Sequence, residues 1–217
     1  ICRHGEGGES SFKNQIDYED FIKGQEESYD WPQIDENSPM GLCYTSGTTG
    51  KPKGVMYTHR STYLHTLAGC LTDAMSLTAL DSLLGIVPMF HAMGWGLPFN
   101  ASMLGCKHVM PHRFMTPDRF LQLMHDEGVT IATGVPTIWQ GVKAAIEAAD
   151  GKLDLSKLDR LTCGGSAPPV SMMRWYWDTL NVEMIQGWGM TETNPLGTLS
   201  RKCAKFTQQE MSEDEQF

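Results

Sequence analysis

From residue 40 onward, short apolar runs bounded by turn residues alternate with longer segments that carry helix signals. Such short runs are typical of buried strands, whereas a capping residue or proline before spaced apolar positions favours a helix. The alternation predicts an α/β fold with a mainly parallel sheet and helices on its faces. The expected strands are 41–45, 54–59, 83–87, 107–111, 129–133, 158–165 and 182–189, and the expected helices are 61–75, 97–104, 117–127, 136–149 and 170–180.

Capping residues define the helix boundaries. Thr116 is followed by Pro117, a pair typical of a cap and a first helical residue. For the helix at 61–75 the expected cap is Ser61 or Thr62, because hydroxyl side chains accept hydrogen bonds from the first free backbone N–H groups.

The first 38 residues differ from the rest. Residues 1–38 are polar and rich in Glu, Gly, Ser and Asp, which indicates a loop or linker with one short helix near 18–23. Residues 39–217 carry the alternating pattern and are expected to form part of one larger domain. The sequence starts with Ile1 and ends in the polar run TQQEMSEDEQF, so we expect an excerpt of a longer polypeptide; a processed mature chain is the alternative.

Composition narrows the class of protein. Apolar residues make up 41% of 217 residues, which is enough for a core, and the formal net charge of −9 argues against nucleic acid as a partner. The six cysteines form no CxxC pair, which favours reduced thiols over a disulfide framework or a zinc site. No apolar run reaches the ~20 residues of a membrane span, and no signal peptide is visible. We therefore expect a cytoplasmic protein without a transmembrane segment.

The stretch YTSGTTGKPKG at 44–54 concentrates glycines, hydroxyl residues and lysines directly after an expected strand. Glycines let successive backbone N–H groups turn toward an anion, hydroxyl groups add donors, and lysines add positive charge, so the stretch suits phosphate. It lacks the GxxxxGK[ST] order of the common NTPase loop, since Pro52 follows Gly50 and Lys51, and no GxGxxG occurs in the chain. Composition alone leaves a flexible surface loop as the alternative.

Two further Gly-rich segments, 164–168 and 187–192, also follow expected strands. In open α/β sheets, ligands bind beyond the carboxyl ends of the strands. The coincidence of three such segments at strand ends predicts one binding site there.

Three motifs in the same order resemble those of the adenylate-forming superfamily, which contains acyl-CoA synthetases, luciferases and adenylation domains of peptide synthetases. They are YTSGTTGKPKG, GGSAPP at 164–169 and QGWGMTET at 186–193. The resemblance covers nearly all of residues 40–200. Together with VPMFHAMGWGLPF, it points to medium- and long-chain fatty acyl-CoA ligases, a subgroup that includes ligases for small thioether acids. The resemblance implies ATP-dependent activation of a carboxylic acid and transfer to coenzyme A.

The resemblance also implies roles for individual residues. The loop would bind the ATP phosphates, the second and third motifs would enclose the adenylate, and Mg²⁺ would be held by oxygen ligands. Thr45 and Glu192 are the implied metal ligands, and Thr45, Lys53, His91 and Glu192 the implied catalytic residues. The implied nucleotide-binding residues are Thr45, Ser46, Gly47, Thr48, Thr49, Gly50, Lys51, Lys53, Gly164, Gly165, Ser166, Ala167, Gln186, Gly187, Trp188, Gly189 and Thr191.

For the acid, the resemblance implies contacts from His91, Trp95 and Gly165. The histidine would lie between the carboxylate and the adenylate, and the tryptophan would line the acyl tunnel. Both also have an ordinary interpretation, because a lone histidine or a tryptophan in an apolar run is often a core residue. His108 and His112 are four residues apart, but Pro111 argues against one shared helical face, so we predict no metal pair there.

Parts of the family pattern are missing from this sequence. The aspartate that holds the ribose, and the small C-terminal domain with its lysine, are not in the 217 residues. We therefore expect the isolated chain to be inactive, and a homodimer is possible for the complete protein. Two alternatives stay open: an adenylating enzyme with another acceptor, and a nucleotide-binding homologue without catalysis.

Overall fold

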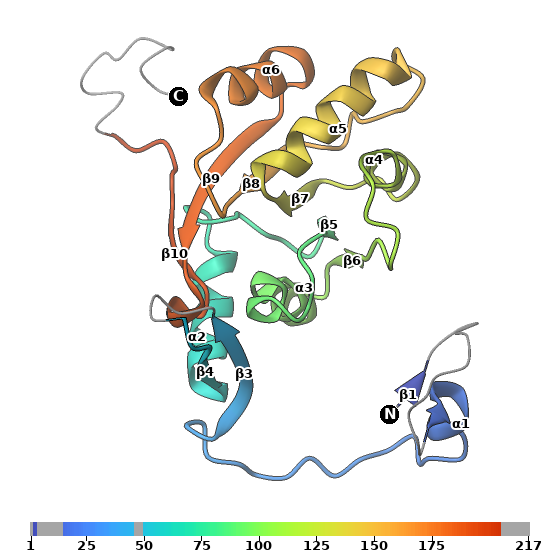
Figure 1. The fold of residues 1–217 in the computed structure, drawn as a ribbon, viewed down its shortest axis with the longest axis vertical. Helices are drawn as coiled ribbons and strands as arrows, with labels where there is room; N and C mark the ends of the chain where they lie inside the picture. The colour runs from blue at the N-terminus through green and yellow to red at the C-terminus, as the bar shows by residue number, and fades with distance from the viewer. Residues whose placement is uncertain (1, 4–14, 46–49, 205–217) are drawn as a thin grey trace. The chain divides into compact units, whose positions relative to one another are not determined.

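The computed structural model describes residues 2–3, 15–45 and 50–204, in two compact units, Ile1–Asp35 and Glu36–Phe217 (Figure 1). In the first unit, β1 (Cys2–Arg3) pairs in parallel with β2 (Ile16–Asp17), and α1 (Tyr18–Ile22) follows. The Asp17 side chain caps α1 by accepting a hydrogen bond from the Glu19 N–H (3.1 Å). The short helix expected near 18–23 is thus present.

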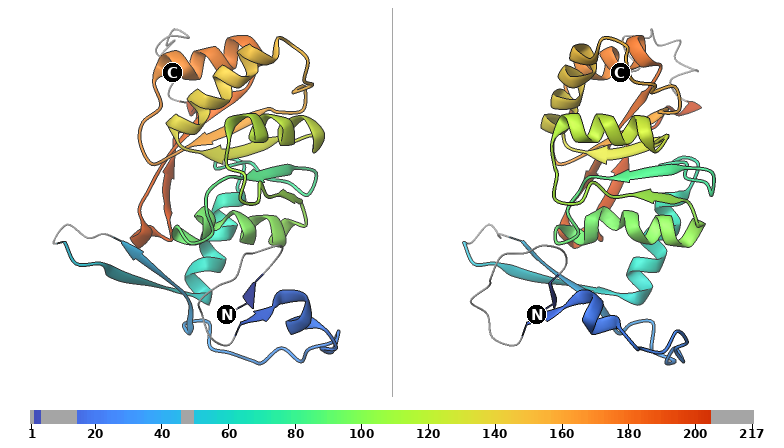
Figure 2. Two further views of the ribbon diagram at one scale, coloured as in Figure 1. Left: turned by 45° about the vertical axis from the view of Figure 1, so that its right-hand side comes forward. Right: turned by 90° about the vertical axis from the view of Figure 1, so that its right-hand side faces the viewer.

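The second unit is built on a twisted sheet whose strand order is β10-β9-β8-β7-β5-β6 within the described residues (Figures 1 and 2). Every pair is parallel except the antiparallel β9–β10 pair, which confirms the predicted mainly parallel α/β architecture. Strand β10 was not predicted. The strands are β5 (Ser82–Gly85), β6 (Lys107–Val109), β7 (Ile131–Gly134), β8 (Arg160–Cys163), β9 (Glu183–Gly189) and β10 (Leu196–Leu199).

Helices cover both faces of this sheet (Figure 2). The fully buried Trp139 and Tyr176 lie in the larger core, where α4, α5 and α6 pack on one face. Leu83 belongs to a second core with α3, while its neighbour Leu84 belongs to the first, as the alternation of side chains along a strand requires. The helices are α2 (His59–Cys70), α3 (Leu97–Leu104), α4 (Pro117–Asp126), α5 (Pro136–Ala149) and α6 (Val170–Leu180).

Strands β3 (Pro39–Thr45) and β4 (Lys53–Thr58) form a separate antiparallel ribbon. The strand expected at 41–45 is present as β3, but it is buried on one face only. The Cys43 side chain on one face is 4% exposed, whereas Tyr44 on the other is 67% exposed. A ribbon covered on one face alternates in burial, and the short apolar run did not reveal this.

Helix α2 begins earlier than predicted and ends at Cys70. Its cap is Thr58 rather than Ser61 or Thr62, because the Thr58 hydroxyl accepts from the Ser61 N–H (3.0 Å) and the Ser61 hydroxyl from the Thr58 N–H (3.1 Å). This reciprocal pair is a capping box, with a serine in the third helical position. Across the described residues, no helix combines the length and apolar character needed to traverse a bilayer.

Candidate functional site

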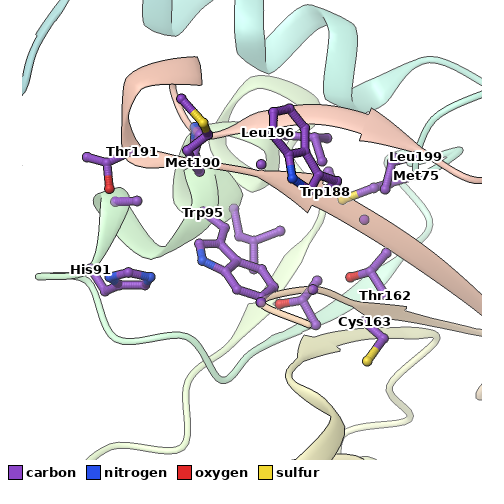
Figure 3. Close-up of a pocket in the computed structure, with 18 of the residues that line it drawn as sticks. Met75, His91, Trp95, Thr162, Cys163, Trp188, Met190, Thr191, Leu196 and Leu199 are labelled. Atoms are coloured by element: carbon purple, nitrogen blue, oxygen red, sulfur yellow. The ribbon is translucent and has the colours of Figure 1, made fainter. Parts of the chain in front are cut away.

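A cavity of about 330 Å³ lies at the carboxyl ends of β7, β8 and β9 (Figure 3). Its position agrees with the expectation that ligands bind where parallel strands end. All three segments singled out in the sequence contribute to its lining, together with η1 (Ala92–Gly96) and η2 (Thr191–Thr193). The predicted site residues that line it are Thr45, His91, Trp95, Gly164, Gly165, Gly187, Trp188, Gly189, Thr191 and Glu192.

Two tryptophans line the cavity, and each packs on a glycine. Trp95 projects from η1 and Trp188 from β9 (Figure 3). A Cβ atom on Gly164 would lie 2.9 Å from the Trp95 ring, and one on Gly197 would lie 2.8 Å from the Trp188 ring. The glycines therefore provide the space that the two rings occupy. Trp188 is 55% exposed, so part of its ring is accessible to a planar ligand.

The backbone of η1 is left-handed throughout. The φ angles are 46° at Ala92, 54° at Met93, 63° at Gly94, 57° at Trp95 and 79° at Gly96. Left-handed conformation costs about 1–2 kcal/mol for each residue other than glycine. This turn directs Trp95 into the cavity, and strain of this kind is often concentrated at functional sites.

The Gly-rich loop joins the two strands of the β3–β4 ribbon. Thr45 at the end of β3 pairs with Lys53 at the start of β4, and Thr45 also lines the cavity, so the base of the loop lies at the cavity rim. Gly50 has a φ of 79°, a conformation that favours glycine. The predicted residues Ser46, Gly47, Thr48 and Thr49 lie outside the described residues.

The Glu192 side chain is exposed and lines the cavity. Within the described ranges it forms no ion pair or hydrogen bond with protein, so its oxygens are free to bind a cation. No group of three metal-ligating side chains exists among the described residues. A single carboxylate with a hydroxyl oxygen from Thr45 suits Mg²⁺, which commonly binds through one or two carboxylates and the phosphates of its substrate.

Several predicted residues do not line the cavity: Gly50, Lys51, Lys53, Ser166, Ala167 and Gln186. Conversely, much of the lining was not predicted. The sequence of β10, LGTL, has only a weak strand pattern, so it did not indicate that Leu196 and Leu199 line a cavity. The unpredicted lining residues are Met75, Ala92, Leu97, Thr133, Thr162, Cys163, Met190, Pro195, Leu196 and Leu199.

Burial determines the protonation of two side chains in this region. Burial raises the pKa of Cys163 to about 12, so its thiol stays protonated at neutral pH and is a poor nucleophile. Burial lowers the pKa of His65, which lies behind the cavity wall, and favours the neutral imidazole. The site thus offers backbone groups, hydroxyls and one carboxylate rather than a nucleophile.

Comparison with known proteins gives a family match over almost the whole chain. The model described as "AMP-binding enzyme" matches residues 5–215. A medium-chain-fatty-acid–CoA ligase from Ectopseudomonas oleovorans is 46% identical over 202 residues, which cover 93% of this chain and 36% of that protein. A 3-methylmercaptopropionyl-CoA ligase from Ruegeria lacuscaerulensis is 42% identical over 188 residues, covering 87% of this chain and 34% of that protein.

A solved structure of similar fold comes from Archaeoglobus fulgidus. It is a long-chain-fatty-acid-CoA ligase with a TM-score of 0.64 and 26% identity, matched over 73% of this chain and 32% of that chain. The chain described here therefore spans about a third of the length of the relatives that it matches.

Proposed function

This chain belongs to the AMP-binding enzyme family, and we propose that it forms part of an ATP-dependent acid–thiol ligase that converts a fatty acid to its coenzyme A thioester. One observation carries the proposal: residues from the three sequence motifs, Thr45, Gly164 and Trp188 among them, line one cavity at the ends of the parallel strands. We further propose that residues 39–217 belong to the large domain of that ligase, whose ribose-binding aspartate and catalytic lysine lie elsewhere.

The reaction has two steps. A carboxylate oxygen of the acid bonds to the α-phosphorus of ATP, the bond to the bridging oxygen breaks, and pyrophosphate leaves with the electron pair. The sulfur of coenzyme A, having lost its proton, then bonds to the acyl carbon, and AMP leaves. Neither step needs a protein nucleophile, so positioning and charge stabilisation are sufficient. This requirement agrees with a cavity lined by glycines, hydroxyls and a protonated thiol.

The nucleotide would occupy the glycine-rich side of the cavity. Residues 46–53 would bind the β- and γ-phosphates, the adenine would stack against Trp188, and Gly164 and Gly165 would contact the adenylate. Glu192 and Thr45 would hold Mg²⁺, which when bound neutralises charge on the phosphates. The exposed ring of Trp188 and the unpaired carboxylate of Glu192 support these roles.

The acid would occupy the apolar side. Met75, Leu97 and Leu199, which belong to or pack against the second core, line the cavity and suit an alkyl chain better than a charged group. His91 would lie between the carboxylate and the adenylate. The names of the relatives support a fatty or thioether acid, but one methylene changes discrimination by only about 1–3 kcal/mol, so chain length is left open.

We propose that the complete enzyme is cytoplasmic and forms a homodimer. The cysteines at positions 43, 70, 106, 163 and 203 are free, which fits a reducing compartment. Light scattering of the complete protein would test the dimer.

Carboxylate-dependent ATP–pyrophosphate exchange by the complete protein tests the proposed function. Short-, medium- and long-chain acids and a thioether acid would be compared, and AMP release would be followed with and without coenzyme A. We expect exchange with one acid class, and AMP release that requires coenzyme A. AMP release with another acceptor instead would favour the alternative enzyme class. ATP binding without exchange for any acid would overturn the proposal in favour of a non-catalytic homologue.

A further inference from the structure

Segment 191–196 carries Glu192 and is bound to the end of β4 and to α2 through side chains. It consists of η2 and the turn into β10, and it lines one side of the cavity. The segment forms a tight turn, which is closed by the N–H of the preceding Met190 donating to the Pro195 carbonyl (3.0 Å). Among the described residues, three hydrogen bonds join it to β4 and α2: the Tyr57 hydroxyl to the Thr191 carbonyl (2.7 Å), the Ser61 hydroxyl to Asn194 Oδ1 (2.6 Å), and the Leu196 N–H to His65 Nε2 (3.0 Å).

The three side chains that make these bonds are four residues apart. Tyr57 is next to the cap of α2, and Ser61 and His65 lie one turn apart on the helix, so all three can face the same neighbour. We call Tyr57, Ser61 and His65 the three-residue clamp. Tyr57 is 3% exposed and its hydroxyl bond to Thr191 is partly buried, so leaving this bond unmade is costly.

His65 contacts both walls of the cavity from behind. Its Nε2 atom accepts from a backbone N–H of one wall, which assigns the proton of the neutral ring to Nδ1. On the other side, a Cβ on Gly96 would lie 3.1 Å from Nδ1, so the ring packs directly on the residue after Trp95. Nδ1 is buried and has no hydrogen-bond partner among the described residues. The ring is therefore wedged between the turn that holds Trp95 and the segment that holds Glu192.

We propose that Tyr57, Ser61 and His65 are positioning residues that hold segment 191–196 against α2, so that Glu192 faces the nucleotide. Within the clamp, His65 has two contacts that bear on the cavity. It accepts a hydrogen bond from the Leu196 N–H, and its ring packs on the turn that holds Trp95. The effect of the clamp on catalysis rests on the proposed ligase function. Its effect on the stability of segment 191–196 does not.

The test uses two substitutions at one position in the complete protein. His65→Leu fills the space without an acceptor and leaves the Leu196 N–H unpaired, whereas His65→Gln supplies an amide oxygen. For His65→Leu we expect kcat of ATP–pyrophosphate exchange to fall about 5- to 100-fold with KM for the acid little changed, and for His65→Gln a fall of less than about threefold. Tyr57→Phe should give a smaller loss, with Tyr63→Phe on the exposed side of α2 as its control.

Hydrogen–deuterium exchange of the ligand-free protein gives the second readout. In His65→Leu, amides of 190–199 should exchange at least about tenfold faster than in the wild type, while those of α5 stay unchanged, because only local opening is made easier. Wild-type protection of 190–199 in His65→Leu, or equal losses in the leucine and glutamine variants, would overturn the proposal. If the wild type shows no pyrophosphate exchange with any acid, the ligase function fails, and the deuterium measurement still decides whether the clamp exists.

Discussion

The two ends of the same parallel strands use polar residues in opposite ways. At the amino end, the buried Asp81 accepts hydrogen bonds from the Thr78 N–H (2.7 Å) and the Thr130 hydroxyl (2.6 Å) and pairs with Arg160. At the carboxyl end, the hydroxyls of Thr133 and Thr162 are buried without a hydrogen-bond partner in the part of the chain that the structure describes. At the amino end the Arg160 Nε atom also lacks a hydrogen bond among the described residues, but it lies 3.0 Å from the Asp159 carboxylate, so its charge is compensated. The two threonine hydroxyls at the carboxyl end have no such compensation and lie beside a cavity.

The distance along the chain between these two environments is very short. Thr130 precedes β7 and Thr133 lies within it, and Arg160 begins β8 two residues before Thr162. A buried polar network stabilises a fold only when its members are all paired, whereas a site must keep polar groups and space for its ligand. Along one strand, the residues that stabilise the fold and those that line the cavity are therefore only three positions apart.

The largest loss of stability is expected from a substitution at the amino end of the strands. Asp81→Ala removes the buried carboxylate that pairs with Arg160, which keeps only the exposed Asp159 carboxylate (3.0 Å) and the Ser76 carbonyl (2.8 Å) as partners among the described residues; the free energy of unfolding should fall by about 3 kcal/mol. The rate of pyrophosphate exchange per folded molecule should not change, because the cluster lies at the opposite end of the strands. Urea unfolding and exchange rates corrected for the folded fraction would measure both, with the exposed Asp73→Ala as control. A lower rate per folded molecule would show that the two ends are coupled.

At the carboxyl end we expect a large loss of activity with little change in stability. Glu192→Ala should reduce pyrophosphate exchange about 100- to 1,000-fold, the loss typical of removing one group that stabilises transition-state charge. Stability should change by less than about 0.5 kcal/mol, since the side chain is exposed. The matched control is Glu147→Ala, which removes an exposed carboxylate from α5 and should leave the exchange rate unchanged. Wild-type exchange by Glu192→Ala would remove this carboxylate from the proposed mechanism.

A third prediction compares the two glycines that support the tryptophans. In Gly164→Ala the new methyl would meet the Trp95 ring, whose backbone is held in a left-handed turn, so we expect a cost of about 1–3 kcal/mol. The acid KM should rise with it. In Gly197→Ala the half-exposed Trp188 can move away, and the cost should be smaller, with the change appearing in the ATP KM. Thermal unfolding and steady-state exchange would measure these effects; equal changes in both variants would contradict the distinction.

Much of the sheet and its helices could be predicted because their signals are local. Helix α5 occupies 136–149 as predicted, since Pro136 opens it and its apolar residues face one side. The left-handed turn at 92–96 could not be predicted, because its conformation costs energy locally and depends on tertiary packing. Strand β10 was missed for a related reason: its four residues become a strand by pairing with β9.

The same distinction holds for the candidate site. Motif residues such as Gly165 and Trp188 were found because glycines and hydroxyls at strand ends have a local chemical meaning. The apolar lining residues Met75, Leu97 and Leu199 could not be separated from ordinary core residues, since only the tertiary arrangement brings them to one cavity. His65 gave no signal for the same reason, as its partner is 131 residues away in the sequence.

The smallest expected effect is a pH dependence at the amino end. Burial by itself would raise the pKa of Asp81, but hydrogen bonds from Thr130 and Thr78 and the charge of Arg160 outweigh it and lower the pKa. A carboxyl group whose folded pKa lies below its unfolded value of about 3.9 contributes stability above that pH. The contribution is lost as pH falls through the folded pKa.

The unfolding free energy of the wild type should therefore exceed that of Asp81→Asn by a constant amount between about pH 5 and 7, and the excess should shrink below about pH 4. Urea unfolding of both proteins across this range measures it, with Asp73→Asn as the exposed control. A difference that persists unchanged at pH 3 would mean that Asp81 stabilises the sheet through its hydrogen bonds alone. The charge on Asp81 would then add nothing to the stability of the amino end, which would depend on hydrogen bonds of the kind that Thr133 and Thr162 lack at the carboxyl end.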